Sequence, residues 1–132
     1  MEKALYYKWL FIIGAVFNWI MAAGFTLLSI IFYSSIFSLF GTSPPPTLFF
    51  LHALLALIAV YGIGYFIVGL DITKNRGIVW LGILSKMAFF FYCCIFYLLG
   101  DLKFIIVPLG FLDFIFACLF IEFLINFKNP IE

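Results

Sequence analysis

Long runs of apolar residues alternate with short polar segments along this chain of 132 residues. Each run is close to or above the roughly 20 residues that a helix needs to cross the hydrocarbon core of a bilayer. The polar breaks fall at 33–46, 71–77 and 100–103, and the first ends in three prolines, which stop a helix because they lack an amide donor. The pattern predicts four membrane-spanning helices, over residues 9–32, 47–70, 78–99 and 104–127.

The short connections between these runs make consecutive helices antiparallel neighbours. The predicted fold is therefore an all-α membrane protein, a single up-down-up-down bundle of four helices over residues 1–132. The first apolar run is too long for the core of a signal peptide, so we expect this helix to be retained. Residues 33–40 are expected to extend the first helix or to lie at the membrane interface as a lid, and Thr47 is expected to cap the second helix.

Composition agrees with a membrane protein and excludes other classes. Hydrophobic residues make up 67% of the chain and charged residues only 10%, a balance that leaves too little charge for the surface of a soluble domain. The net charge of +1 provides no basic patch, which excludes nucleic acid as a partner. The lipid bilayer is the expected environment.

The distribution of basic residues predicts the orientation. Basic residues near the ends of transmembrane helices favour the cytoplasmic side. The side that holds Lys103 carries no other basic residue, and the opposite side, with both termini and the 71–77 turn, carries five. We therefore expect both termini in the cytoplasm, together with Lys3, Lys8, Lys74, Arg76 and Lys128.

Two charged residues interrupt the apolar runs near their middle. Lys86 lies within the third predicted helix and Asp113 within the fourth, and each costs about 2.5–3.5 kcal/mol on insertion into a membrane. Counting 1.5 Å per residue from opposite surfaces brings both to a similar depth, so they can pair. Asn18 in the first helix reaches the same depth, and His52 in the second lies nearer the outer surface.

Small residues at helical spacing indicate the inward-facing sides of the helices. In the second helix His52, Ala56 and Ala59 share a face, with glycines on its flank, which turns Tyr61 and Tyr65 toward lipid or a partner. Glu122 is turned away from Asp113 and is expected to reach basic residues at the cytoplasmic end. The other inward stripes are Gly14, Asn18, Ala22, Phe25 and Ser29; Gly82, Lys86, Phe89 and Cys93; and Gly110, Asp113 and Ala117.

The polar residues allow a structural and a functional interpretation. Lys86 and Asp113 form either an ion pair that fixes two helices or a site that binds or protonates a ligand, and the sequence favours neither. Asn18 and His52 are more typical of interhelical hydrogen bonding, with contact to the same ligand as the alternative. One histidine and scattered carboxylates provide no metal site, and no catalytic residue is assigned. The three cysteines lack a CxxC spacing and are expected to be structural.

One stretch resembles a known group of proteins. It comprises the glycine-rich "YGIGYFIVGL", the charged turn "DITKNRG", "WLGILSKMAFFFY" with its intramembrane lysine, and "GFLDFIFACLFIEFL". These features, over about half of the chain, resemble small bacterial four-helix inner-membrane proteins that are DoxX-like in size and layout. The resemblance implies a bacterial inner-membrane protein, associated in some relatives with respiratory or quinone-linked enzymes, and it implies no catalytic residue.

The sequence is compatible with three functions. The first is a non-enzymatic accessory module that binds a lipid- or quinone-type ligand, with self-association or a membrane enzyme as partner. It is favoured because 20 phenylalanines suit a pocket for a flat or polyisoprenoid molecule and because no catalytic constellation is present. The second is an oligomeric transporter of small amphiphiles. The third is a membrane enzyme acting on a lipid or isoprenoid, disfavoured because an aspartate paired with lysine is a poor proton donor.

Overall fold

Five helices and the turns between them make up residues 2–128, the part of the chain that the computed structural model describes, and no strand occurs in this range. Four of the helices are long and apolar enough to cross a membrane. The all-α membrane fold with four long helices is confirmed, and one short helix is added to it. The helices are α1 (Glu2–Ile31), α2 (Tyr33–Leu39), α3 (Phe49–Leu70), α4 (Arg76–Leu98) and α5 (Ile106–Asn126).

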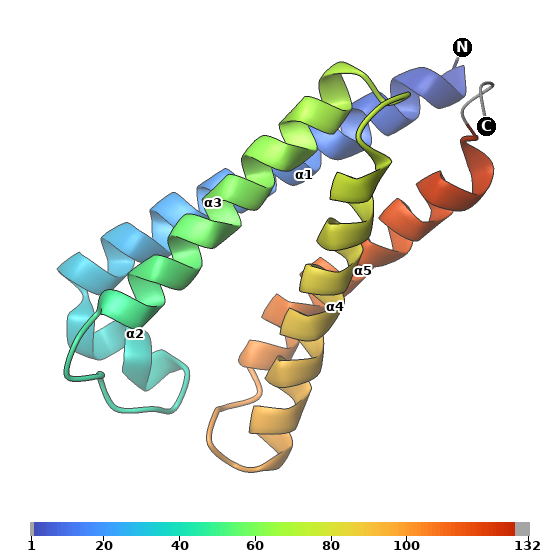
Figure 1. Cartoon of the computed structure of the whole chain (residues 1–132). Coiled ribbons are helices and arrows are strands. Elements are labelled where there is room, and N and C mark those ends of the chain that lie inside the picture. The colour runs from blue at the N-terminus through green and yellow to red at the C-terminus, as the bar shows by residue number, and fades with distance from the viewer. Residues whose placement is uncertain (1, 129–132) are drawn as a thin grey trace.

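The four long helices form two antiparallel hairpins. Helix α1 packs along α3, and α4 packs along α5, whereas contacts between the hairpins are few. Figure 1 shows that the hairpins converge at the end that holds the chain termini and diverge toward the end that holds α2. The bundle therefore has the shape of a V, with two closely packed hairpins as its arms, rather than four evenly packed helices.

The hydrophobic core lies where the hairpins converge. Phe11 of α1 stacks on Phe120 of α5 with ring centroids 4.8 Å apart, and Tyr65 of α3 meets the same Phe120 edge-on at 5.1 Å. Aromatic pairs at such distances add to the stabilisation from buried area. The core consists of Tyr7, Leu10, Phe11, Ala15, Tyr65, Val68, Ile72, Val79, Ile83, Phe120 and Phe123.

Helix α1 begins at Glu2, seven residues before the predicted start at residue 9. The cause is packing: Tyr7 is buried and sets its ring edge-on against Phe123 at 5.1 Å. At 1.5 Å per residue the 30 residues of α1 extend for about 45 Å, longer than the roughly 30 Å hydrocarbon core. A helix of that length tilts or projects beyond the bilayer.

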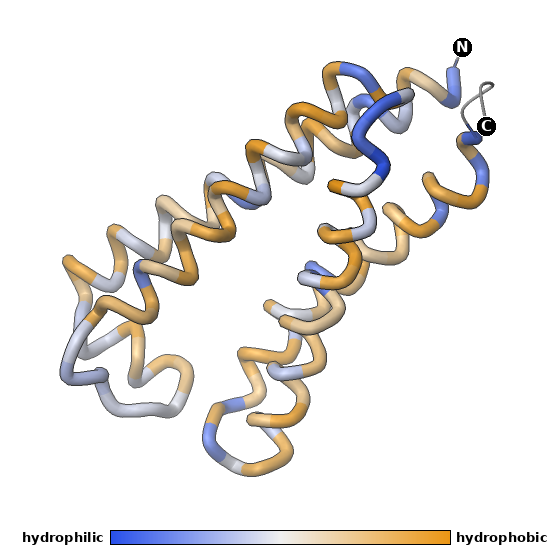
Figure 2. Tube along the Cα trace, in the orientation of Figure 1, coloured by the Kyte–Doolittle hydropathy of each residue, from blue (hydrophilic) through white to orange (hydrophobic). Residues whose placement is uncertain are grey.

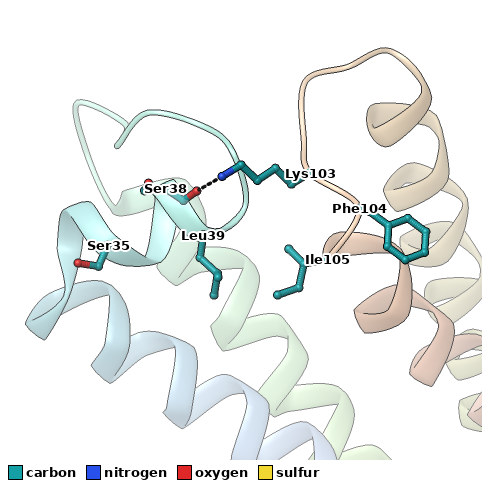
Figure 3. A pocket seen from close by; sticks show the side chains of 6 residues that line it. All are labelled: Ser35, Ser38, Leu39, Lys103, Phe104 and Ile105. Atoms are coloured by element: carbon teal, nitrogen blue, oxygen red, sulfur yellow. Dashed lines mark hydrogen bonds between the residues drawn. The ribbon is translucent and has the colours of Figure 1, made fainter.

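The segment 33–46 closes the wide end of the V. The backbone amide of Lys103, in the α4–α5 connection, donates to the carbonyl of Phe40 at 2.8 Å, and its ammonium lies 3.4 Å from the carbonyl of Ser38. We call these two bonds the Lys103 clasp. Figure 3 shows Lys103 reaching across to Ser38, above an open hollow where Leu39 and Ile105 also lie. Of the two expectations for residues 33–40, the structure favours a separate helix with a lid-like position.

Polar residues lie mainly at the two ends of the molecule. Figure 2 shows hydrophilic segments at the converging end, around the α3–α4 turn, and at the α4–α5 connection, with mostly apolar positions between them. The termini and the α3–α4 turn share one end, and the α4–α5 connection lies at the other. This is the arrangement that an up-down-up-down chain requires.

The remaining helix ends differ from the prediction by two residues or fewer. Helix α3 begins at Phe49 rather than 47, and its capping residue is Leu48, not Thr47 as expected; Thr47 lies one residue earlier, where its hydroxyl accepts a hydrogen bond from the Phe49 amide at 3.2 Å. Helix α4 begins at Arg76, directly after Asn75, whose φ of 64° is left-handed. The predicted domain of residues 1–132 includes residues 1 and 129–132, which lie outside the described range.

Candidate functional site

A cavity of about 420 Å³ lies between the arms of the V. Both hairpins line it, as do Phe37, Phe40 and Thr42 of the lid segment and Leu102 beside the Lys103 clasp. Its walls are overwhelmingly apolar, and polar groups gather at the end next to the hydrophobic core. Further lining residues are Phe17, Asn18, Met21 and Phe25; Leu51, Leu54, Leu55, Leu57, Ile58, Tyr61 and Tyr65; Ser85, Lys86 and Phe89; and Ile106, Leu109 and Asp113.

Lys86 and Asp113 meet at that polar end, as their predicted depth suggests. The Lys86 ammonium donates to Asp113 Oδ1 at 2.7 Å and to Asn18 Oδ1 at 3.2 Å. Asn18 in turn donates through Nδ2 to the carbonyl of Ile58 on α3 at 3.0 Å. Helices α1, α3, α4 and α5 are therefore joined through one lysine. A charge-assisted hydrogen bond of this length is among the stronger ones that proteins form.

Three aromatic rings surround the same ammonium. Its nitrogen lies 5.5 Å from the ring centroid of Phe17, 5.4 Å from that of Tyr65 and 5.2 Å from that of Phe116. Cations within about 6 Å of an aromatic face are stabilised by the ring quadrupole, and more strongly where water is excluded. The rings and the carboxylate together offset the cost of burying Lys86, whose side chain is 4% exposed.

Tyr65 faces the interior of the protein, contrary to the expectation from the sequence. It was expected to face lipid or a partner, but it is 0% exposed and lies in both the core and the cavity wall. The inward face of α3 passes through Gly62, Tyr65 and Gly69 rather than through Ala56, which is exposed. Gly82 of α4 makes room for the tyrosine, because a Cβ at that position would lie 2.6 Å from the Tyr65 ring.

The hydroxyl of Tyr65 is buried without a hydrogen-bond partner among residues 2–128. Ser85 is the nearest polar side chain to it, and the Ser85 hydroxyl donates to the carbonyl of Gly82 at 3.0 Å. A buried hydroxyl without a partner costs about 1–3 kcal/mol on protein-based scales. An unpaired donor at the polar end of an apolar cavity is a group that a ligand can satisfy.

His52 does not join the other three predicted site residues. Its Nε2 lies 2.9 Å from the hydroxyl of Ser29, so it connects α3 to α1 within one hairpin. It precedes Ile58 by six residues, which places it about 9 Å farther along the helix axis from the Asn18 bond. The structure thus brings Lys86, Asp113 and Asn18 together and leaves His52 as an interhelical contact.

Glu122 lies away from this centre, as expected from its position on α5. Its carboxylate is 3.4 Å from the hydroxyl of Tyr7, near the converging end. Arg76, one of the predicted partners, donates to the carbonyls of Leu124 and Phe127 at the end of α5. These contacts attach the start of α4 to the end of α5.

The Lys86–Asp113 pair constrains the chemistry of this site. The Asp113 carboxylate is held by an ammonium at 2.7 Å, which disfavours its use as a proton donor. Among the described residues, no group of three His, Cys, Asp or Glu side chains is placed to hold a metal ion. The site thus combines an ion pair of zero net charge with an apolar chamber.

Sequence reasoning missed the aromatic surroundings of Lys86. Phe17, Tyr65 and Phe116 come from three helices, and no local pattern links them. A usable signal existed only for Tyr65, which lies three residues after Gly62 and four before Gly69, on the side where the helix can be approached closely.

Comparison of this chain with protein-family models, with curated proteins and with solved structures finds no match.

Proposed function

We propose that this protein is a non-enzymatic membrane module that holds one hydrophobic, lipid- or quinone-type ligand between its two helical hairpins. The observation that carries the proposal is the apolar cavity of about 420 Å³ with a single polar end. Its volume falls within the range of about 300–1,000 Å³ that is typical of small-molecule sites. The head of the ligand lies against the Lys86–Asp113 pair, and its apolar part extends toward the lid segment.

Packing supports this role over a purely structural one. A bundle that needed Lys86 and Asp113 only as an internal contact could pack its four helices evenly around them. Here the hairpins diverge beyond the pair, the Lys103 clasp bridges the wide end, and a cavity of about 420 Å³ is left between the hairpins. Empty apolar volume forfeits dispersion contacts, so an occupant stabilises this shape.

The test is mass spectrometry of small molecules that co-purify with the protein from native membranes. The variant is Met21→Trp, which places an indole in the cavity from the α1 wall. We expect the wild type to carry a lipid-soluble molecule and this variant to lose it.

The neighbouring position supplies the matched control. Ile20 lies one residue away on the outer face of α1, with 64% of its surface exposed. Ile20→Trp adds the same indole outside the cavity and should retain the ligand. Equal retention by both variants, or a wild type without any bound molecule, contradicts the proposal.

The membrane placement and the partners belong to the same proposal. We place the protein in a bacterial inner membrane with both termini in the cytoplasm, as the basic residues favour. The DoxX-like features support an accessory role beside a membrane enzyme, with self-association as the alternative. Crosslinking in native membranes distinguishes the two, because a homo-oligomer yields only multiples of this chain.

A transporter of small amphiphiles is the second candidate. It is favoured by the sparse contact between the hairpins, which could move as two bodies about their converging end. Flux measurements in liposomes, comparing the wild type with Lys86→Met and Asp113→Asn, decide the matter. Absent flux, or flux that neither substitution changes, excludes transport through this cavity.

A further inference from the structure

At the polar end of the cavity, the more exposed partner of the ion pair is the hydrogen-bond acceptor, the Asp113 carboxylate. Both residues of the pair line the cavity, but the Lys86 side chain is only 4% exposed, whereas the Asp113 side chain is 18% exposed. The ammonium engages Oδ1 of the carboxylate. Among residues 2–128, Oδ2 accepts no hydrogen bond, so this oxygen retains its full accepting capacity.

The charge balance selects among ligand heads that could reach Oδ2. Lys86 and Asp113 sum to zero, so an anionic head would place an unbalanced negative charge against the carboxylate. An ammonium head would compete with Lys86 for the same carboxylate and leave two cations beside one anion. An uncharged head keeps the buried end neutral, which a low-dielectric cavity requires.

Hydrogen-bonding capacity narrows the choice further. A ketone or an ester only accepts hydrogen bonds and leaves Asp113 Oδ2 unpaired. A hydroxyl can donate to Oδ2 and also accept from a neighbouring donor. The buried hydroxyl of Tyr65, in the wall of the same cavity, lacks an acceptor among the described residues.

We propose that the occupant of this cavity is a lipid alcohol whose hydroxyl donates to Asp113 Oδ2, with its hydrocarbon part among the phenylalanine and leucine side chains. This inference rests on the proposed function and specifies its ligand class. The Tyr65 hydroxyl supplies a second hydrogen bond, to the alcohol oxygen.

The experiment compares five probes that share one C16 chain and differ only at the head. They are 1-hexadecanol, its methyl ether, hexadecane, palmitate and hexadecylamine, each at the same mole fraction in lipid nanodiscs that contain the full chain. Native mass spectrometry counts the probe that remains bound. The ether keeps the oxygen and removes only the donor, so we expect it to bind at least about tenfold more weakly than the alcohol.

A double variant tests whether the ion pair is the source of that preference. Lys86→Met together with Asp113→Leu replaces the pair by apolar side chains of similar size, which buried pairs often tolerate. We expect the variant to bind the alcohol and the ether equally, because both probes still accept a hydrogen bond from Tyr65 and neither can donate to Asp113. The control is Lys74→Met with Asp71→Asn, which removes the exposed ion pair of the α3–α4 turn and should keep the alcohol preference.

Each outcome decides between the two proposals. Equal binding of the alcohol and the ether to the wild type overturns the alcohol assignment and leaves the hydrophobic-ligand function standing. Tighter binding of palmitate or hexadecylamine also overturns it, because the site then behaves as charged. Failure of every probe, hexadecane included, overturns the proposed function itself. The wild-type series does not depend on the folding of any variant.

Discussion

At the scale of single residues, the groups around Lys86 offset the cost of burying its charge within the membrane. Lys86 is held by one carboxylate, one amide oxygen and three aromatic rings. Breaking a buried ion pair leaves an uncompensated charge, whereas replacing both partners removes the desolvation cost together with the attraction. The single and double substitutions should therefore behave very differently.

We expect Lys86→Met alone to lower the free energy of unfolding by about 3–5 kcal/mol, since the half-buried Asp113 carboxylate is left without its cation. Lys86→Met combined with Asp113→Leu should recover most of that loss, with about 1 kcal/mol remaining because Asn18 Oδ1 loses its donor. Reversible unfolding in mixed detergent micelles measures both variants. A double variant as unstable as the single one would show that the pair is not self-contained.

Unlike Lys86→Met, Tyr65→Phe should stabilise the protein. The substitution removes a hydroxyl without a partner among the described residues and keeps the ring against Phe120. In ligand-free protein we expect the free energy of unfolding to rise by about 1 kcal/mol. Tyr92→Phe, on the exposed face of α4, should leave it unchanged in the same assay. A loss of stability in Tyr65→Phe would reveal a hydrogen bond that stabilises the empty protein.

At the scale of elements, glycines set how closely the helices approach. A Cβ at Gly62 would lie 2.6 Å from Nε1 of Trp19, the group that donates to the carbonyl of Ala59 at 3.1 Å. It would also lie 3.2 Å from the carbonyl oxygen of Ala15 in the α1 backbone. The α1–α3 hairpin therefore depends on this position for its separation.

We expect Gly62→Ala to cost about 1–3 kcal/mol through overpacking and to change the fluorescence of Trp19. Gly24 is the matched control, because a Cβ there meets nothing within 4 Å. Gly24→Ala should stabilise α1 by up to about 1 kcal/mol through helix propensity alone. Equal effects of the two substitutions would argue against close packing at Gly62.

The Lys103 clasp offers a second matched pair of glycines. Gly41 and Gly100 both have left-handed φ, of 84° and 86°, so alanine costs about 1–2 kcal/mol at either. Only at Gly41 would a Cβ meet another group, the Lys103 side chain at 2.6 Å. We expect Gly41→Ala, and not Gly100→Ala, to speed the exchange of a bound C16 probe, followed by dilution into probe-free nanodiscs. An unchanged exchange rate in both variants would show that the Lys103 clasp does not limit the release of the bound probe.

At the scale of the whole molecule, the basic residues predict one orientation. The converging end carries both chain termini and the α3–α4 turn, and the other end carries Lys103. We expect a cysteine placed at Asp101 to react with a membrane-impermeant thiol reagent in intact cells, and one placed at Thr73 to react only after permeabilisation. Both are introduced into a chain whose three native cysteines are replaced by alanine. The reverse labelling pattern would invert the topology.

The amino-acid sequence was sufficient to predict four apolar spans, their antiparallel order and the meeting of Lys86 with Asp113. Span length and depth follow from counting residues, because the helical rise is constant. The same counting brought Asn18 to the level of the pair. Residue counting could not identify the inward face of α3, because this helix is apolar all round and has small residues on more than one face.

The tertiary structure alone decided that the hairpins diverge and leave a cavity. The V results from where the bulky aromatic side chains pack: the core around Phe11, Tyr65 and Phe120 draws one end together, and the Lys103 clasp bridges the other. It also placed His52 against Ser29, away from the polar centre, and enclosed Lys86 in three rings from three helices. Such contacts join residues far apart in the chain, where periodicity carries no information. Whether the ion pair is only a structural link or the anchor of a ligand therefore depends on the cavity beside it.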